Sequence, residues 1–189
     1  FGAGYVQNEA DFDQFGGRIE SDGFMVGLYA AYDPGNFYVK AAGSYSDMDS
    51  DSQRNINIGA ISGTAFGEFD SEIWAASLEA GARVNLGAAV LTPYAGLDFV
   101  DAEIKPFTET GVPGANLAIT NAEEDYLTSE LGLKLGFELG MVYPELKAAW
   151  RHSFTDNDPT FVDMAFADAP AGSDFTVMGP MREEDAFVA

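Results

Sequence analysis

Residues 71–100 alternate between apolar and polar side chains in two successive passes, with a short glycine-centred break between them. From residue 74 to residue 86 every second side chain is apolar, and residues 91–99 repeat the pattern. Because successive side chains of a strand point to opposite faces, this pattern predicts a hairpin with one apolar face and one polar face, turning at residues 86–88. Taken alone, such a hairpin fits a soluble β-sandwich as well as a membrane barrel.

The same alternation recurs along the chain. It predicts further strands over residues 23–32, 37–45, 126–139 and 145–154, with partial strands over residues 1–6, 175–179 and 185–189. The 21 glycines and the aromatic content of 13% are typical of β-structure with sharp turns. We therefore expect an all-β, antiparallel chain of about eight visible strands.

The predicted connections fall into two classes. Short turns are expected at residues 33–36, 86–88 and 139–142; long acidic loops are expected at residues 7–22, 46–71, 101–125 and 155–174. In an up-and-down meander these classes lie at opposite ends of the sheet, which is typical of outer-membrane barrels. Most of the 31 acidic residues fall in the long loops, so the net charge of −22 is predicted to be a property of the loops.

The apolar faces carry aromatic residues near their ends. Eight steps along a strand, from Phe37 to Tyr45, cover about 26 Å, roughly the height of the apolar band between two aromatic girdles once the strand is tilted. The predicted girdle residues are Phe24, Tyr32, Phe37, Tyr45, Trp74, Phe99, Phe137, Trp150 and Phe154.

The polar faces carry charges of both signs, which in a barrel would pair across a wet lumen. The predicted lumen-facing charged residues are Lys40, Glu79, Arg83, Asp98, Glu130, Lys134, Glu138, Glu145, Lys147 and Arg151. Together with the loop asymmetry, this favours a transmembrane β-barrel over a soluble acidic β-sandwich, which stays open as an alternative.

Several kinds of chemistry find no support in the sequence. A net charge of −22 argues against binding nucleic acid, since phosphate contacts need clustered Lys and Arg. The chain has no Cys and a single His, His152, so neither a Cys nucleophile nor a His-based metal cluster is expected. The acidic run from Asp47 to Asp51 has calcium-loop spacing but continues with Ser52, and Ile58 stands where that loop needs Glu. We expect no enzyme activity, no cofactor and no metal site.

No apolar run approaches the length of a spanning helix, and no signal peptide is visible.

Five segments, in order, resemble the autotransporter β-domain, the barrel of type V secretion proteins in Gram-negative bacteria. They are Arg54-Asn-Ile, Glu79-Ala-Gly with the later LTPYAGLDF, FTETG from Phe107, YPELKAAWRHSF from Tyr143 and FADAPAGSDFTVMG from Phe166.

The resemblance implies an outer-membrane translocator that anchors an N-terminal passenger and helps to export it to the cell surface. Its partners would be outer-membrane lipid and lipopolysaccharide, the passenger, and the barrel-assembly machinery. The family's barrel has twelve strands, so we expect residues 1–189 to be part of a barrel whose first and last strands, pore helix and passenger lie outside this chain. A stand-alone outer-membrane barrel, either a porin-like channel or an adhesin acting through its loops, remains an alternative.

Overall fold

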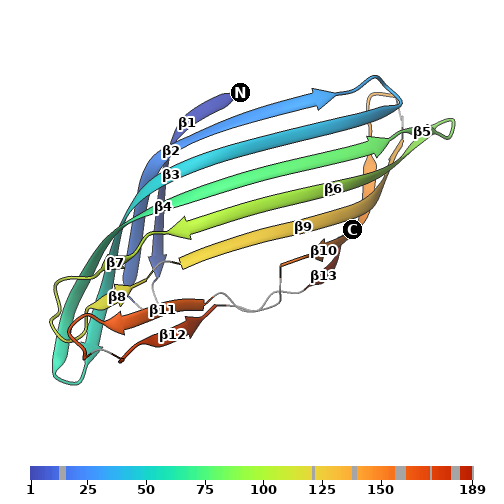
Figure 1. Cartoon of the computed structure of the whole chain (residues 1–189). Helices are drawn as coiled ribbons and strands as arrows, with labels where there is room; N and C mark the ends of the chain where they lie inside the picture. The colour runs from blue at the N-terminus through green and yellow to red at the C-terminus, as the bar shows by residue number, and fades with distance from the viewer. Residues whose placement is uncertain are drawn as a thin grey trace.

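The computed structural model describes residues 1–12, 16–120, 122–137, 140–155, 161–170, 172–179 and 184–188. These residues form thirteen β-strands in two antiparallel sheets, and they include no helix (Figure 1). Accordingly, none of the described segments is a helix long and apolar enough to cross a membrane. The all-β prediction is confirmed.

Nine strands form a long, curved first sheet with the order β1-β2-β3-β4-β6-β9-β10-β13, in which β5 also pairs with β6. Its strands are β1 (Gly2–Phe12), β2 (Gly17–Tyr32), β3 (Phe37–Ile58), β4 (Ile61–Ala82), β5 (Val84–Asn85), β6 (Ala89–Ile104), β9 (Ala122–Phe137), β10 (Glu145–Ser153) and β13 (Asp185–Val188). Along this order each strand lies beside the next one in the up-and-down path, as predicted. β1 and β13 are edge strands, so the sheet is not closed.

The second sheet has four short strands in the order β12-β11-β8-β7. Its strands are β7 (Phe107–Thr108), β8 (Leu117–Ile119), β11 (Phe161–Phe166) and β12 (Phe175–Met178). Figure 1 shows this sheet beside the far tip of the β3–β4 hairpin, at the end opposite the β2–β3 turn.

Two of the three predicted short turns lie wholly within the described residues, and both are confirmed. Residues 33–36 join β2 to β3, where Gly35 has a φ of 108° and its N–H donates to Asp33 Oδ1 at 3.1 Å. Residues 86–88 join β5 to β6, with a φ of 85° at Gly87. Both angles lie in the left-handed region that favours glycine. The third turn includes residues 138 and 139, which lie outside the described part of the chain.

Two predicted loops are wrong. Residues 7–22 belong largely to β1 and β2, and residues 46–71 are the outer halves of β3 and β4, which pair continuously from Phe37↔Ala82 to Ile58↔Ile61. A two-residue turn closes that hairpin, with a φ of 60° at Gly59. In these segments the alternation of apolar and polar residues stops, so their sequence has the pattern of a loop. The backbone pairing between the strands nevertheless continues.

The other two predicted loops are partly correct. Residues 101–125 contain the end of β6, then β7 and β8, and the start of β9. Within residues 155–174 lies β11, while residues 156–160 and 171 are outside the described part.

The uninterrupted registers preserve the two faces predicted from alternation. One face exposes large apolar side chains along most strands, among them Leu28 at 71% and Leu146 at 66%. In a soluble β-sandwich a second layer would bury that face. The second sheet instead contacts the other, polar face of the outer β3–β4 hairpin, as shown below by Arg54 and Ile56.

Candidate translocation surface

A cluster of charged side chains lies on the polar face near the short-turn end of the first sheet. The register puts Lys40 of β3 opposite Glu79 of β4, with Lys40 Nζ 3.8 Å from Glu79 Oε1. Lys134 of β9 reaches the same carboxylate, with its Nζ 3.2 Å from Oε1. Two cations from different strands thus share one carboxylate.

Glu130 of β9 is the centre of the other half of this cluster and is 7% exposed. Its carboxylate accepts hydrogen bonds from the Tyr94 hydroxyl at 2.6 Å and from Arg151 Nη2 at 3.0 Å. Lys147 Nζ lies 2.8 Å from Glu130 Oε1. This buried carboxylate is a satisfied structural charge, because each of its two oxygens has at least one donor.

Two tyrosines that sequence reasoning missed hold these carboxylates in place. The Tyr38 hydroxyl donates to Glu79 Oε1 at 2.7 Å as Tyr94 does to Glu130, and both rings are buried. Lys134 Nζ lies 4.2 Å from the Tyr94 ring centroid, within cation–π range. The signal that could have found them is a tyrosine facing a glycine across each strand pair: Tyr38↔Gly81 and Tyr94↔Gly132.

Arg83 belongs to the same end of the sheet but pairs outside the cluster. Its guanidinium forms two hydrogen bonds with the Asp33 carboxylate, at 2.6 and 2.8 Å, and donates to the Gly35 carbonyl at 3.0 Å. The hydrogen bond from Arg83 holds the pKa of the Asp33 carboxyl below its ordinary value of 3.8. Arg83 therefore fastens the β2–β3 turn to the neighbouring strand.

The remaining predicted charges are more loosely placed. Asp98 is exposed and lines a hollow of about 250 Å³ together with Lys40, Glu79 and Glu130. Glu145 is exposed at the start of β10. Glu138 lies outside the described residues.

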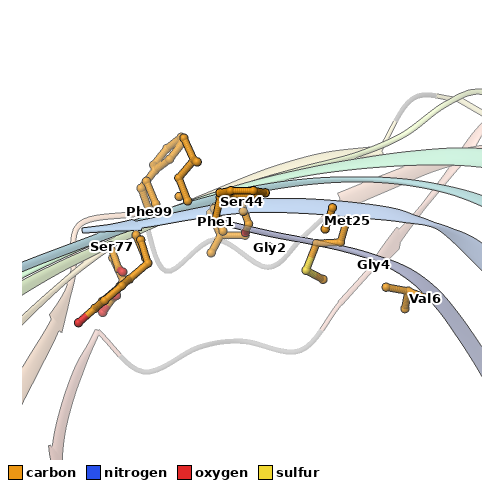
Figure 2. A pocket seen from close by; sticks show the side chains of 18 residues that line it. Phe1, Gly2, Gly4, Val6, Met25, Ser44, Ser77 and Phe99 are labelled. Carbon is orange, nitrogen blue, oxygen red and sulfur yellow. The ribbon is translucent and has the colours of Figure 1, made fainter. Parts of the chain in front are cut away.

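Towards the outer half, the polar face becomes a shallow trough of small side chains. A hollow of about 590 Å³ is lined by Gly27, Ala42, Ser44, Ala75 and Ser77 on three neighbouring strands, with β1 at its edge. Figure 2 shows Met25 and Val6 on one side of the sheet and Phe99 on the other.

The predicted aromatic residues lie on the apolar face, several of them in contact. Ring centroids are 5.8 Å apart for Tyr32 and Phe37, 5.9 Å for Phe24 and Tyr45, and 4.5 Å for Tyr45 and Trp74. Phe99 and Phe137 are on the same face by register, and Phe154 contacts His152.

His152 is part of a small polar group on this apolar face. Asp185 Oδ1 of β13 accepts a hydrogen bond from Trp150 Nε1 at 2.9 Å and lies 3.1 Å from His152 Nδ1. This group joins β10 to β13.

The acidic run of residues 47–51 forms a strand, and the calcium-loop geometry is therefore absent. Its carboxylates face other carboxylates across the hairpin, as in Asp49↔Asp70 and Asp51↔Glu68. Among the described residues, no group of His, Cys, Asp or Glu could hold a metal ion.

Arg54 and Glu109 form an ion pair that links the outer hairpin to the second sheet. Arg54 Nε donates to Glu109 Oε1 at 3.0 Å, Nη2 also contacts Oε2, and Glu109 is 6% exposed. Arg54 and Glu109 belong to two of the segments that resemble the autotransporter β-domain. Because the two residues are 55 positions apart, the sequence alone does not predict their contact.

No curated protein matches this chain. The sequence model of the family described as "Autotransporter beta-domain" matches residues 1–189, the whole chain. The antiparallel, up-and-down order of the strands in this chain agrees with the outer-membrane barrel of that family. The chain therefore belongs to the autotransporter β-domain family, whose domain is an outer-membrane translocator barrel for passenger export.

Proposed function

We propose that this chain is the membrane-embedded part of a translocator in the bacterial outer membrane, which anchors an N-terminal passenger and takes part in its export. The observation that carries the proposal is the division of the first sheet into an exposed apolar face and a polar face with paired charges. Lipid would cover the apolar face and water the polar face. A closed sheet can stand in lipid because its backbone hydrogen bonds are all made between its own strands.

In this proposal the charged cluster faces the lumen, and the trough of small residues accommodates the linker of the passenger. The lumen-facing residues are Lys40, Glu79, Arg83, Asp98, Glu130, Lys134, Glu145, Lys147 and Arg151. The aromatic residues of the apolar face lie at the two lipid boundaries, where amphipathic rings are preferred. The two open edges of the sheet are consistent with a place within a twelve-stranded barrel.

The proposed partners are outer-membrane lipid, lipopolysaccharide and the barrel-assembly machinery, in addition to the passenger. The role is architectural. The carboxylates of Glu79 and Glu130 are occupied by lysines and tyrosine hydroxyls, which supports a domain without catalysis.

A test combines membrane behaviour with export in the complete native polypeptide. We expect a detergent-extracted protein that changes its gel mobility on boiling, and a passenger that protease can reach on intact cells. A protein that is monodisperse without detergent would overturn the membrane proposal. A heat-modifiable barrel that bears no passenger would favour a stand-alone channel or adhesin.

A further inference from the structure

Residues 107–119, here called the strap, pair with β4 at Thr110 and then lie against the polar face of the outer β3–β4 hairpin through Val112 and Ala115. The unbroken β3–β4 register keeps Arg54 and Ile56 on the same face as Tyr38 and Lys40. Arg54 holds Glu109 of the strap, and Ile56 packs in a buried cluster with Ala65, Val112 and Ala115. The strap therefore occupies the side of the hairpin on which the translocation surface lies.

The strap is fastened at several independent points. Phe66 and Thr110 exchange two backbone hydrogen bonds of 2.8 Å, and the rings of Phe69 and Phe107 stack with centroids 4.7 Å apart. The Glu109 carboxylate also accepts the Leu117 N–H at 2.8 Å.

The strap also binds a second connection, the one that leaves β10. β8 pairs with β11, and the N–H of Gly114 donates to Asp168 Oδ2 at 2.9 Å. Ala167 N–H donates to the Asn116 carbonyl at 2.9 Å. Two connections from separate strands are therefore one folded unit, the second sheet, attached to the outer hairpin through the strap (Figure 1).

We propose that the second sheet is a cap over the outer mouth of the barrel, latched by Arg54 and Glu109. The inference rests on the proposed translocator function. A brace on the lipid-facing side of β3–β4 would leave the mouth open, whereas the strap extends into the space above the polar face. Passage through the mouth then requires the strap to leave the hairpin.

The latch suits this role because both partners are needed. Arg54 Nη2 additionally donates to the Ala115 carbonyl at 3.0 Å, so the guanidinium binds the strap at two places. Loss of Arg54 would leave the buried Glu109 carboxylate without its cation. A release variant therefore combines Arg54→Ala with Ile56→Asp, which removes the ion pair and disrupts the apolar cluster.

The cysteine-free chain allows a reversible lock to be added. An ideal Cβ on Gly63 would lie 3.9 Å from the Val112 Cβ, which suits a disulfide. Gly63→Cys with Val112→Cys thus ties the strap to the hairpin. The matched control is Phe12→Cys with Gly17→Cys, whose Cβ atoms would lie 3.8 Å apart, which ties β1 to β2 and leaves the strap untouched.

The experiment measures ion conductance of the complete native polypeptide in planar lipid bilayers. We expect the release variant to conduct at least twice as well as the wild type. When the strap lock is added to the release variant, its oxidation should lower the conductance to the wild-type level, and its reduction should raise the conductance again. The control disulfide, added to the same variant, should leave the conductance unchanged.

Two outcomes would overturn the cap. One is a strap lock that forms, as shown by its mass, but leaves conductance unchanged; the strap would then be a brace only. The other is a lock that fails to form, because residues 63 and 112 would then not be neighbours. Failure of the translocator proposal is a separate result: the wild type would lack heat-modifiable gel mobility and surface-exposed passenger.

Discussion

The ring of Tyr38 lies over Gly81, its direct partner across β3 and β4, where an added Cβ would be 2.6 Å from the ring. Tyr94 covers Gly132 in the same way, at 2.5 Å. The two tyrosine hydroxyls donate to the carboxylates of Glu79 and Glu130 in the charged cluster. The two glycines thus set the positions of the rings, and through them the positions of Glu79 and Glu130.

The first prediction concerns this close approach. Gly81→Ala or Gly132→Ala should displace the ring and cost about 1–3 kcal/mol, the usual range for overpacking. The measurement is the urea midpoint of the reconstituted barrel. Gly96→Ala is the control, because a Cβ there meets only ordinary contacts at 3.7 Å and beyond. Equal effects at all three glycines would show that lost backbone freedom, and not ring displacement, is responsible.

The second prediction concerns Glu130. Glu130→Ala removes the acceptor shared by Tyr94, Lys147 and Arg151, and should destabilise the barrel by about 1–3 kcal/mol, because the buried Tyr94 hydroxyl loses its acceptor whereas the two cations remain partly exposed to water. Glu145→Gln, at an exposed position of the same face, should change the unfolding free energy by less than about 0.5 kcal/mol. A small effect of Glu130→Ala would mean that lumen water replaces the carboxylate.

The third prediction concerns pH and the outer hairpin. A hydrogen bond with Asp70, helped by burial and by the negative charges of Asp70, Asp22 and Asp47, raises the pKa of the Asp49 carboxyl above its ordinary 3.8. The folded hairpin therefore binds this proton more tightly than the unfolded chain. Its contribution to stability is complete below pH 3.8 and is lost as the pH rises through the folded-state pKa.

Amide hydrogen exchange across the outer β3–β4 pairs, corrected for the intrinsic pH dependence of exchange, measures this effect. Protection should increase when the pH falls from neutral into the acidic range. Asp49→Asn should increase protection at neutral pH and flatten its pH dependence, because the amide keeps a hydrogen bond without charge. Unchanged pH dependence in Asp49→Asn would contradict the assignment to this carboxyl.

The fourth prediction concerns the junction of β10 and β13. Asp185→Ala removes the acceptor of Trp150 Nε1 and the neighbour of His152, so we expect a loss of about 1 kcal/mol in stability and a shifted Trp150 emission. A Trp74→Phe background isolates the signal of Trp150, since the chain has two tryptophans. Asp185→Asn keeps an acceptor and should restore most of the stability. If Asn and Ala behave alike, the negative charge itself is what matters.

The inner half of the first sheet was predictable because its information is local. Period-two alternation placed the strands from Phe37 and from Trp74, and a glycine-containing turn such as Asp33-Pro-Gly marked where one strand ended. The family likeness added the expected strand order. The same local rule put Lys40, Glu79 and Lys134 on one face, although it could not say that Lys134 and Lys40 share the carboxylate of Glu79.

The outer half was missed for two physical reasons. Residues 46–58 have mostly polar side chains on both faces. Their hydropathy therefore does not alternate, and it cannot distinguish a paired strand from a loop. The strap depends on a contact between Arg54 and Glu109, which are 55 positions apart, and on burial that only the folded hairpin creates. Tyr38 and Tyr94 were passed over because their role is defined by the glycine on the neighbouring strand.

The two-residue turn at Gly59 and Ala60 also bears on the order in which the chain folds. Closing so short a loop loses little chain entropy, and each further pair of β3 and β4 then adds a neighbour to an existing ladder. Pairing can therefore begin at the turn, in water, and extend through the polar segments towards the half with the apolar face. The part of the hairpin that ends farthest from the lipid is thus able to acquire its structure before the part that must enter it.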